Sequence, residues 1–176
     1  MKGMNNLARR ESGIWMPMQV AAVCYRVSRN SLEFLLVNTS SGKWTFPKGH
    51  TDPDLSGSEA AAREAREEAG VKGTIEESYF DCYLDSKRGY SNESGPREIL
   101  IAAYLLEVAQ TGLPEELYRN PTWFAPLEAK QRLAERRERK YGQEMARIVE
   151  GAVDLVIGSD ARAVTLYASR YGRSAI

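Results

Sequence analysis

The chain of 176 residues contains one histidine, His50, and only two cysteines, Cys24 and Cys82. A single histidine excludes a zinc site built from several histidines, and any Ser-His-Asp triad would have to use it. The cysteines stand far apart among apolar and aromatic neighbours, so we expect buried free thiols. The sequence also lacks a Walker loop, a G-x-G-x-x-G motif and a G-x-S-x-G motif, which are the usual signals for three large enzyme classes.

The sequence has no excess of one charge and no long apolar run. Lysine and arginine together number 24, as do aspartate and glutamate, so the balance does not favour general nucleic-acid or membrane-surface binding. No window approaches the roughly 18 apolar residues of a membrane span, and residues 1–13 lack a signal-peptide core. We therefore expect a cytoplasmic protein of one domain over residues 1–176, with flexible or accessory ends at 1–15 and 160–176.

Short apolar segments separated by turn-forming residues predict strands, and one early segment predicts a helix. Ser56 followed by Glu59 fits a capping box, and Gly70 fits a helix end, so the early helix lies between Ser56 and Gly70. We expect strands at residues 18–27, 32–37, 43–46, 74–85, 98–108 and 121–124, a loop at 49–57, and late helices at 126–140 and 143–156. This order of elements predicts a mixed α/β sandwich.

Three glutamates, Glu64, Glu67 and Glu68, lie close together in the early helix. At about 100° per residue they fall within an arc of about 100°, and alanines in the neighbouring arc allow close packing on a sheet. Like charges at this spacing repel by a few tenths of a kcal/mol per pair. Either a solvated helix face or a bound hard cation such as Mg²⁺ or Mn²⁺ accounts for them, and the spacing alone leaves both open.

The preceding segment, WTFPKGH, favours the cation. A backbone bend at residues 47–49 places Lys48 and His50 directly before the acidic helix. A cation bridging phosphate oxygens, with a lysine neutralising a further charge, forms a receptacle for a polyphosphate. The sequence therefore predicts a polyphosphate site that combines carboxylates with Lys48.

Residues 49–71, GHTDPDLSGSEAAAREAREEAGV, resemble the Nudix box of the Nudix hydrolases. That signature reads Gly, five residues, Glu, seven residues, Arg-Glu, an aliphatic residue, any residue, Glu-Glu, any residue, Gly and an aliphatic residue. The positions that match at the required spacing are Gly49, Arg63, Glu64, Glu67, Glu68, Gly70 and Val71. The resemblance implies a Nudix-type α/β/α sandwich with a mixed β-sheet.

Two positions depart from the signature. Leu55 stands where the first glutamate belongs, and Ala65 is smaller than the usual aliphatic residue. In the family's usual picture the first glutamate is not the main metal ligand, so its loss concerns loop geometry and rate more than reaction type. Asp52, Asp54 or Glu59 is the expected substitute.

The resemblance implies hydrolysis of a nucleoside diphosphate linked to another group, by water attacking phosphorus. Glu64, Glu67 and Glu68 would carry Mg²⁺ or Mn²⁺, with the Gly49 carbonyl as a further ligand. Glu64 or Glu68 would accept the proton of the water, and the sequence does not choose between them. Arg63 would orient a carboxylate of the box rather than contact the substrate.

Residues outside the box complete the predicted site. In this family a further metal ligand often comes from an acidic residue beyond the box, for which Glu116 is the first candidate and Glu115 the second; a solvated loop acid is the alternative for each. Lys48, His50 and Arg97 are the expected substrate-binding residues, with a surface role as the alternative for Arg97.

Several substrates stay open. PKGH is similar to diadenosine polyphosphate hydrolases, and FPKGH before the box is also similar to diphosphoinositol polyphosphate phosphohydrolases. We rank dinucleoside polyphosphates first, diphosphoinositol polyphosphates second and an RNA 5′ end third, and expect no membrane partner. The basic run at 130–140 would attract the second or third substrate, or is a plain solvated helix face. The alternative from another class is a Nudix-fold nucleotide sensor without turnover, which Leu55 favours and the intact glutamates oppose.

Overall fold

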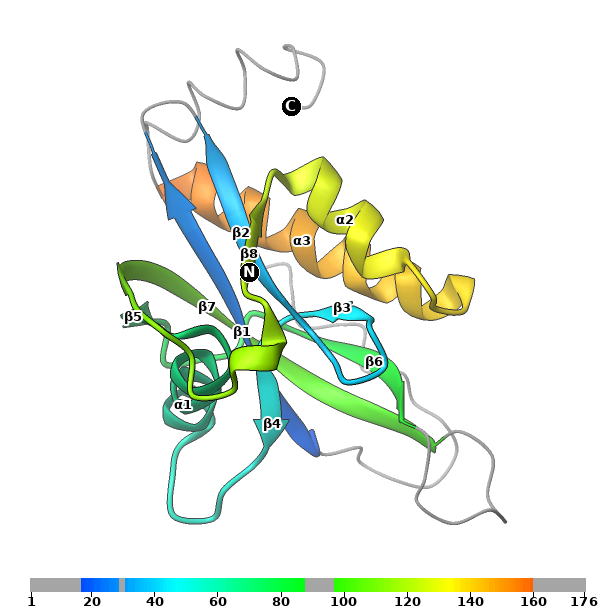
Figure 1. Ribbon diagram of the computed structural model, residues 1–176, viewed down its shortest axis with the longest axis horizontal. Coiled ribbons are helices and arrows are strands. Elements are labelled where there is room, and N and C mark those ends of the chain that lie inside the picture. Colours follow the sequence, from blue (N-terminus) through cyan, green and yellow to red (C-terminus); the bar gives the residue numbers. More distant parts are fainter. Residues whose placement is uncertain (1–16, 29–30, 88–96, 160–176) are drawn as a thin grey trace.

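The computed structural model describes residues 17–28, 31–87 and 97–159, and a mixed sheet forms its middle layer (Figure 1). The strands are β1 Gln19–Val27, β2 Leu32–Asn38, β3 Trp44–Thr45, β4 Lys48–His50, β5 Val71–Ile75, β6 Asp81–Lys87, β7 Arg97–Thr111 and β8 Thr122–Phe124. The helices are α1 Gly57–Ala69, the short 3-10 helix η1 Leu117–Arg119, α2 Pro126–Ala134 and α3 Arg139–Ser159. The predicted ends at 1–15 and 160–176 fall outside the described residues.

The strands β1 and β7 run parallel at the centre of the sheet, and the other described strand pairs are antiparallel. Each central strand is long enough to pair with two other strands along one of its edges. The start of β1 pairs with β4 and its end with β2, while β7 pairs first with β6 and then with β5. In the β1–β4 register Val20 lies opposite Gly49 and Ala21 opposite Lys48, so sheet pairing fixes the backbone of the PKGH segment.

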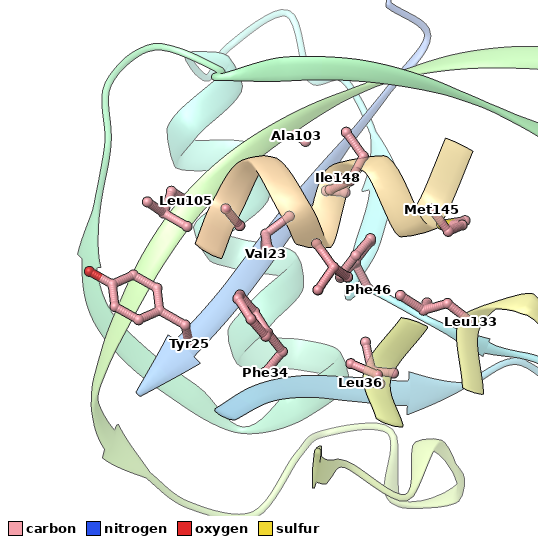
Figure 2. Packing of buried hydrophobic residues seen from close by; sticks show 14 of the residues in the cluster. Val23, Tyr25, Phe34, Leu36, Phe46, Ala103, Leu105, Leu133, Met145 and Ile148 are labelled. Carbon is pink, nitrogen blue, oxygen red and sulfur yellow. The ribbon is translucent and has the colours of Figure 1, made fainter. Parts of the chain in front are cut away.

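Helices α2 and α3 cover one face of the sheet (Figure 1). Figure 2 shows Leu133 of α2 with Met145 and Ile148 of α3 packed near Phe34 and Phe46, and all five side chains are fully buried. Large apolar side chains at helical spacing explain why α3 forms and which way it faces. No helix in the described part of the chain is long and apolar enough to cross a membrane.

Helix α1 covers the opposite face of the sheet and packs through small side chains (Figure 1). The buried face of α1 consists mainly of Ala60, Ala61, Ala65 and Ala69. Because alanine has no atoms beyond Cβ, the helix backbone comes close to the sheet and its acidic side chains are held near rigid strands. The predicted α/β/α sandwich with a mixed sheet is confirmed.

Three predicted elements are wrong in detail, and long-range strand pairing explains the first two. The expected strand at 74–85 is interrupted because five residues between Ile75 and Asp81 oppose only two between Ala103 and Leu106, so the excess is looped out. Gly49 and His50, expected in the loop at 49–57, instead form β4 with Lys48 against β1. The expected helix at 126–140 ends at Ala134, and its last two residues begin α3.

The predicted ends of the acidic helix are confirmed. The Ser56 side chain accepts the Glu59 backbone N–H, and the Glu59 side chain accepts the Ser56 backbone N–H, which makes a full capping box. Gly70 ends α1 in the left-handed conformation at φ 67°, which glycine adopts without strain. These two caps fix which residues of the segment are helical, and therefore where its glutamates lie.

Replacing Ser56 with alanine should lower the free energy of unfolding by about 1 kcal/mol, because one helix N–H loses its acceptor. Ser56→Asp keeps a capping acceptor and should remain close to the unsubstituted protein. Urea denaturation followed by circular dichroism measures both variants. A Ser56→Ala protein as stable as the parent would contradict the capping role.

Candidate functional site

The C-terminal half of α1 presses its glutamates against β4. Glu68 is only 3% exposed, and its Oε2 accepts the backbone N–H of Lys48 at 3.0 Å. The Glu64 carboxylate lies over Gly49, where an added Cβ would come within 2.2 Å of the carboxylate carbon. The structure thus brings together the acidic helix and the PKGH backbone, and Gly49 is required by the close approach of Glu64.

The loop that ends in η1 lies beside α1 and adds a further acid (Figure 1). The backbone N–H groups of Glu115 and Glu116 both donate to the Glu67 carbonyl oxygen, at 2.9 and 3.1 Å. Burial raises the pKa of the Glu64 carboxyl, and the charge of the nearby Glu116 side chain acts in the same direction. Glu115 instead points to Arg66 at 3.9 Å with a side chain 64% exposed, so Glu116 is the better placed of the two candidates.

Arg119 occupies the space between these acids, and sequence reasoning missed it. Its Nη2 pairs with Glu68 Oε1 and its Nε donates to Glu116 Oε2. The guanidinium also lies 5.1 Å from the centre of the Tyr118 ring. The only signal in the sequence was its position three residues after Glu116, a spacing at which side chains meet within a helical turn.

Arg63 links the box acids to the loop before α1. Its Nη1 donates to Asp52 Oδ2 at 2.7 Å, while Nη2 lies 3.8 Å from Glu64 and Nε lies 4.0 Å from Glu67. The pairing with Asp52 holds the pKa of that carboxyl below its ordinary value. One arginine therefore connects three carboxylates and limits how far Glu64 and Glu67 can move.

The three expected substitutes for the missing box glutamate have separate roles in the structure. Asp52 contacts Arg63. Asp54 is exposed and donates its backbone N–H to Asp52 Oδ1 at 3.0 Å, and Glu59 closes the capping box. Leu55, at the position of that glutamate, packs against the α1 side of the core.

Burial sets the electrostatics of the site. It raises the pKa of Glu68 to about 7, although Arg119 and the Lys48 N–H act in the opposite direction. Burial also raises the pKa of Glu64, and the neighbouring charge of Glu67 adds to the effect. A raised carboxyl pKa means that the negative charge is held at a free-energy cost, which an added cation would reduce.

The donor atoms fit a hard divalent cation in kind, since carboxylate and carbonyl oxygens are the ligands that Mg²⁺ and Mn²⁺ take. The positions of these donor atoms do not form a complete metal site. Among the residues that the structure describes, no group of three or more His, Cys, Asp or Glu side chains is placed to hold a metal ion. Arg119 lies between Glu68 and Glu116 and pairs with both.

The predicted substrate-binding residues lie near one end of the sheet. Lys48 Nζ is 3.4 Å from Gln19 Oε1, and His50 is exposed at the end of β4, opposite Gln19. Arg97 is the first residue of β7 and pairs with Lys87, but its side chain falls outside the described part. The structure therefore places the Lys48 backbone beside Glu68 and its ammonium group near Gln19.

Most side chains of the basic run at 130–140 are already engaged. Arg137 is buried, with contacts to Asp85 and to the carbonyl oxygens of Trp44 and Leu133. The remaining pairs are Lys130 with Glu150, Arg132 with Glu128 and Glu135, Lys140 with Glu98, and Arg136 with the Ser41 carbonyl oxygen. These contacts favour a structural helix face over a surface for a polyanion.

Comparison with known proteins gives a family assignment that agrees with the observed fold. A family model described as the NUDIX domain matches residues 17–145. The chain belongs to this family. The predicted relation to the Nudix hydrolases, and within them to diadenosine polyphosphate hydrolases, is confirmed at the level of resemblance.

Individual relatives cover less of the chain. The chain is 43% identical over 51 residues to the mouse (Mus musculus) bis(5′-nucleosyl)-tetraphosphatase [asymmetrical]. The matched segment is 28% of this chain and 35% of that protein. It is 35% identical over 102 residues to the Arabidopsis thaliana Nudix hydrolase 16, mitochondrial, 56% of either chain. A crystal structure of a C. elegans Ap4A hydrolase binary complex aligns with TM-score 0.57 and 25% identity, covering 80% of this chain and 97% of that one. The match thus spans less than two thirds of each of the two curated relatives.

Proposed function

We propose that this Nudix protein is a divalent-cation-dependent pyrophosphohydrolase that cleaves dinucleoside polyphosphates, with diadenosine tetraphosphate as the first candidate substrate. The observation that carries the proposal is the packing of the box acids on the PKGH backbone, through Glu68 to the Lys48 N–H and Glu64 to Gly49. The similarity to proteins named bis(5′-nucleosyl)-tetraphosphatase and Ap4A hydrolase supports the choice of substrate.

Glu64, Glu67 and Glu68 are the proposed holders of Mg²⁺ or Mn²⁺, together with the Gly49 carbonyl and Glu116. A bound cation would supply positive charge against the phosphate oxygens and make water more acidic. These oxygen donors belong to α1, β4 and the loop before η1, and α1 contacts both β4 and η1. Helix α1 therefore holds the proposed donors together.

The protein groups have distinct proposed tasks. Lys48 neutralises a phosphate charge, with His50 and Arg97 as further substrate contacts. Glu64 is the better proton acceptor of the two open candidates. Glu68 Oε2 already accepts the Lys48 N–H and Glu68 Oε1 is in an ion pair with Arg119, whereas Arg63 approaches Glu64 only to 3.8 Å. 

Diphosphoinositol polyphosphates and RNA 5′ ends rank lower in this proposal, because the basic run that would attract them is largely held in ion pairs. A small-molecule polyphosphate is the proposed partner. The cytoplasm stays the predicted compartment, although plant relatives are named for the mitochondrion and the chloroplast.

A nucleotide sensor without turnover is the second candidate. Leu55 in place of the box glutamate supports it. A sensor would bind nucleotide tightly and release no product.

Product analysis over a substrate panel with Mg²⁺ or Mn²⁺ tests the proposal. The panel compares diadenosine tetraphosphate with diadenosine hexaphosphate, diphosphoinositol pentakisphosphate, ADP-ribose and triphosphorylated RNA. We expect diadenosine tetraphosphate to be cleaved fastest. We expect EDTA to abolish turnover. Glu67→Gln should lower kcat by at least about 100-fold because a charged oxygen donor is lost, while Glu77→Gln, an exposed acid away from the site, should not. Full turnover by Glu67→Gln would refute the role of Glu67, and tight binding with no cleavage of any compound would favour the sensor.

Asp52→Ala and Asp54→Ala form a matched pair that tests which acid replaces the missing box glutamate. Asp52→Ala frees Arg63 and should lower kcat/KM by roughly 10-fold, the order found when an outer partner of a metal ligand is removed. Asp54→Ala leaves the Arg63 contact in place and should stay within about 2-fold of the parent on the same reasoning. Equal losses in the two variants would contradict a specific role for Asp52.

A further inference from the structure

Arg119 is the basic side chain placed most deeply among the acids of the site. Its side chain is 17% exposed, and that of its partner Glu68 is 5% exposed. Nε and Nη2 of one guanidinium engage two carboxylates that come from different elements, Glu68 from α1 and Glu116 from the loop before η1. Such a bridging arginine neutralises both carboxylates while its planar group fixes their separation.

The backbone around Arg119 is held independently of its side chain. The N–H groups of Glu115 and Glu116 bind the Glu67 carbonyl oxygen, and the Arg119 N–H binds the Glu116 carbonyl oxygen. Besides the two carboxylates, the guanidinium lies 5.1 Å from the centre of the Tyr118 ring, and its Nη1 lies 3.5 Å from the Asn38 carbonyl oxygen. Rotation of the Arg119 side chain would therefore release both carboxylates without moving the loop.

We propose that Arg119 is a resident counter-cation, which stabilises Glu68 and Glu116 when no metal is bound and has to leave them before a divalent cation can bind there. This inference rests on the proposed function, since it takes Glu68 and Glu116 as cation ligands. A carboxylate oxygen that accepts from the guanidinium is not open to Mg²⁺, which needs direct contacts at about 2.0–2.1 Å. Two cations held within a few ångströms also repel strongly at a half-buried site. 

Metal binding to purified Arg119→Gln protein tests the competition directly. Titration with Mn²⁺ alone, followed by calorimetry and by the electron paramagnetic resonance signal of free Mn²⁺, should show tighter binding by roughly 10-fold, the order by which groups around a metal ligand change affinity. Arg119→Lys keeps a positive charge and should bind Mn²⁺ more nearly as the parent does. Arg132→Gln is the matched control, since Arg132 also joins two glutamates but lies on α2, and should not alter Mn²⁺ affinity.

Thermal unfolding supplies a readout that needs no activity. In EDTA the Arg119→Gln protein should unfold at a lower temperature than the parent, because Glu68 loses the positive charge of the guanidinium. Added Mg²⁺ should reduce this difference in unfolding temperature. For Arg132→Gln the difference from the parent should be the same with and without Mg²⁺. 

The unsubstituted protein gives a second test that does not depend on a variant folding. The ¹⁵Nε resonance of Arg119 should shift during a Mg²⁺ titration as the guanidinium leaves the carboxylates. An unchanged resonance at saturating Mg²⁺, or Mn²⁺ binding by Arg119→Gln that equals or falls below that of the parent, overturns the counter-cation role and leaves the proposed hydrolase intact. If neither protein binds Mn²⁺ and the parent cleaves no substrate, the proposed function itself fails and the inference fails with it.

Discussion

The hydrogen bond from the Lys48 backbone N–H to the buried Glu68 carboxylate is the contact on which the site depends. It joins β4, the short strand paired with the start of β1, to the last turn of α1. This hydrogen bond forms only if the helix backbone lies close to the sheet. The alanines of α1 allow that approach, and the absence of a side chain at Gly49 leaves room for the Glu64 carboxylate beside it. The acids are therefore positioned by small residues as much as by charged ones.

This closeness creates an electrostatic problem, because Glu64 and Glu68 are held in a partly water-excluded space where their charges are costly. Two arginines reduce the cost from opposite sides. Arg63, on α1 itself, contacts Asp52 of the preceding loop and approaches Glu64 and Glu67, and Arg119 contacts Glu68 from η1. The chain as a whole is electrically neutral, so the relevant balance is this local one.

Features set by neighbouring residues were predictable from sequence. The ends of α1 follow from Ser56, Glu59 and Gly70, since caps act within one turn, and the box spacing predicted that the glutamates share a helix face. Features set by distant pairing were not. Nothing in the segment 74–85 indicates that β7 offers too few partners for a continuous strand.

The partners of the two arginines show the same limit within the site. Sequence spacing could not choose among Asp52, Asp54 and Glu59 as the substitute for the missing box glutamate, and it did not indicate that Asp52 pairs with Arg63 from a turn in which the Asp54 N–H binds Asp52 Oδ1. Arg119 gave no motif at all, since it meets Glu68 across 51 residues of chain through the folding of β5, β6 and β7. Residues that neutralise a buried charge are in general found only when the fold is known.

The position of Arg119 also bears on whether this protein turns over its ligand. A pure binding module would be served by a permanent internal cation, and burial of the whole arginine among apolar groups would secure one. Arg119 instead ends a three-residue 3-10 helix whose other members, Leu117 and Tyr118, are 73% and 61% exposed. A cation at the edge of a solvent-exposed turn can be exchanged for another, since its release exposes little apolar surface and water can solvate the freed guanidinium. Exchangeability is what a metal-dependent hydrolase needs and what a sensor does not, so the geometry around Arg119 favours the proposed enzyme.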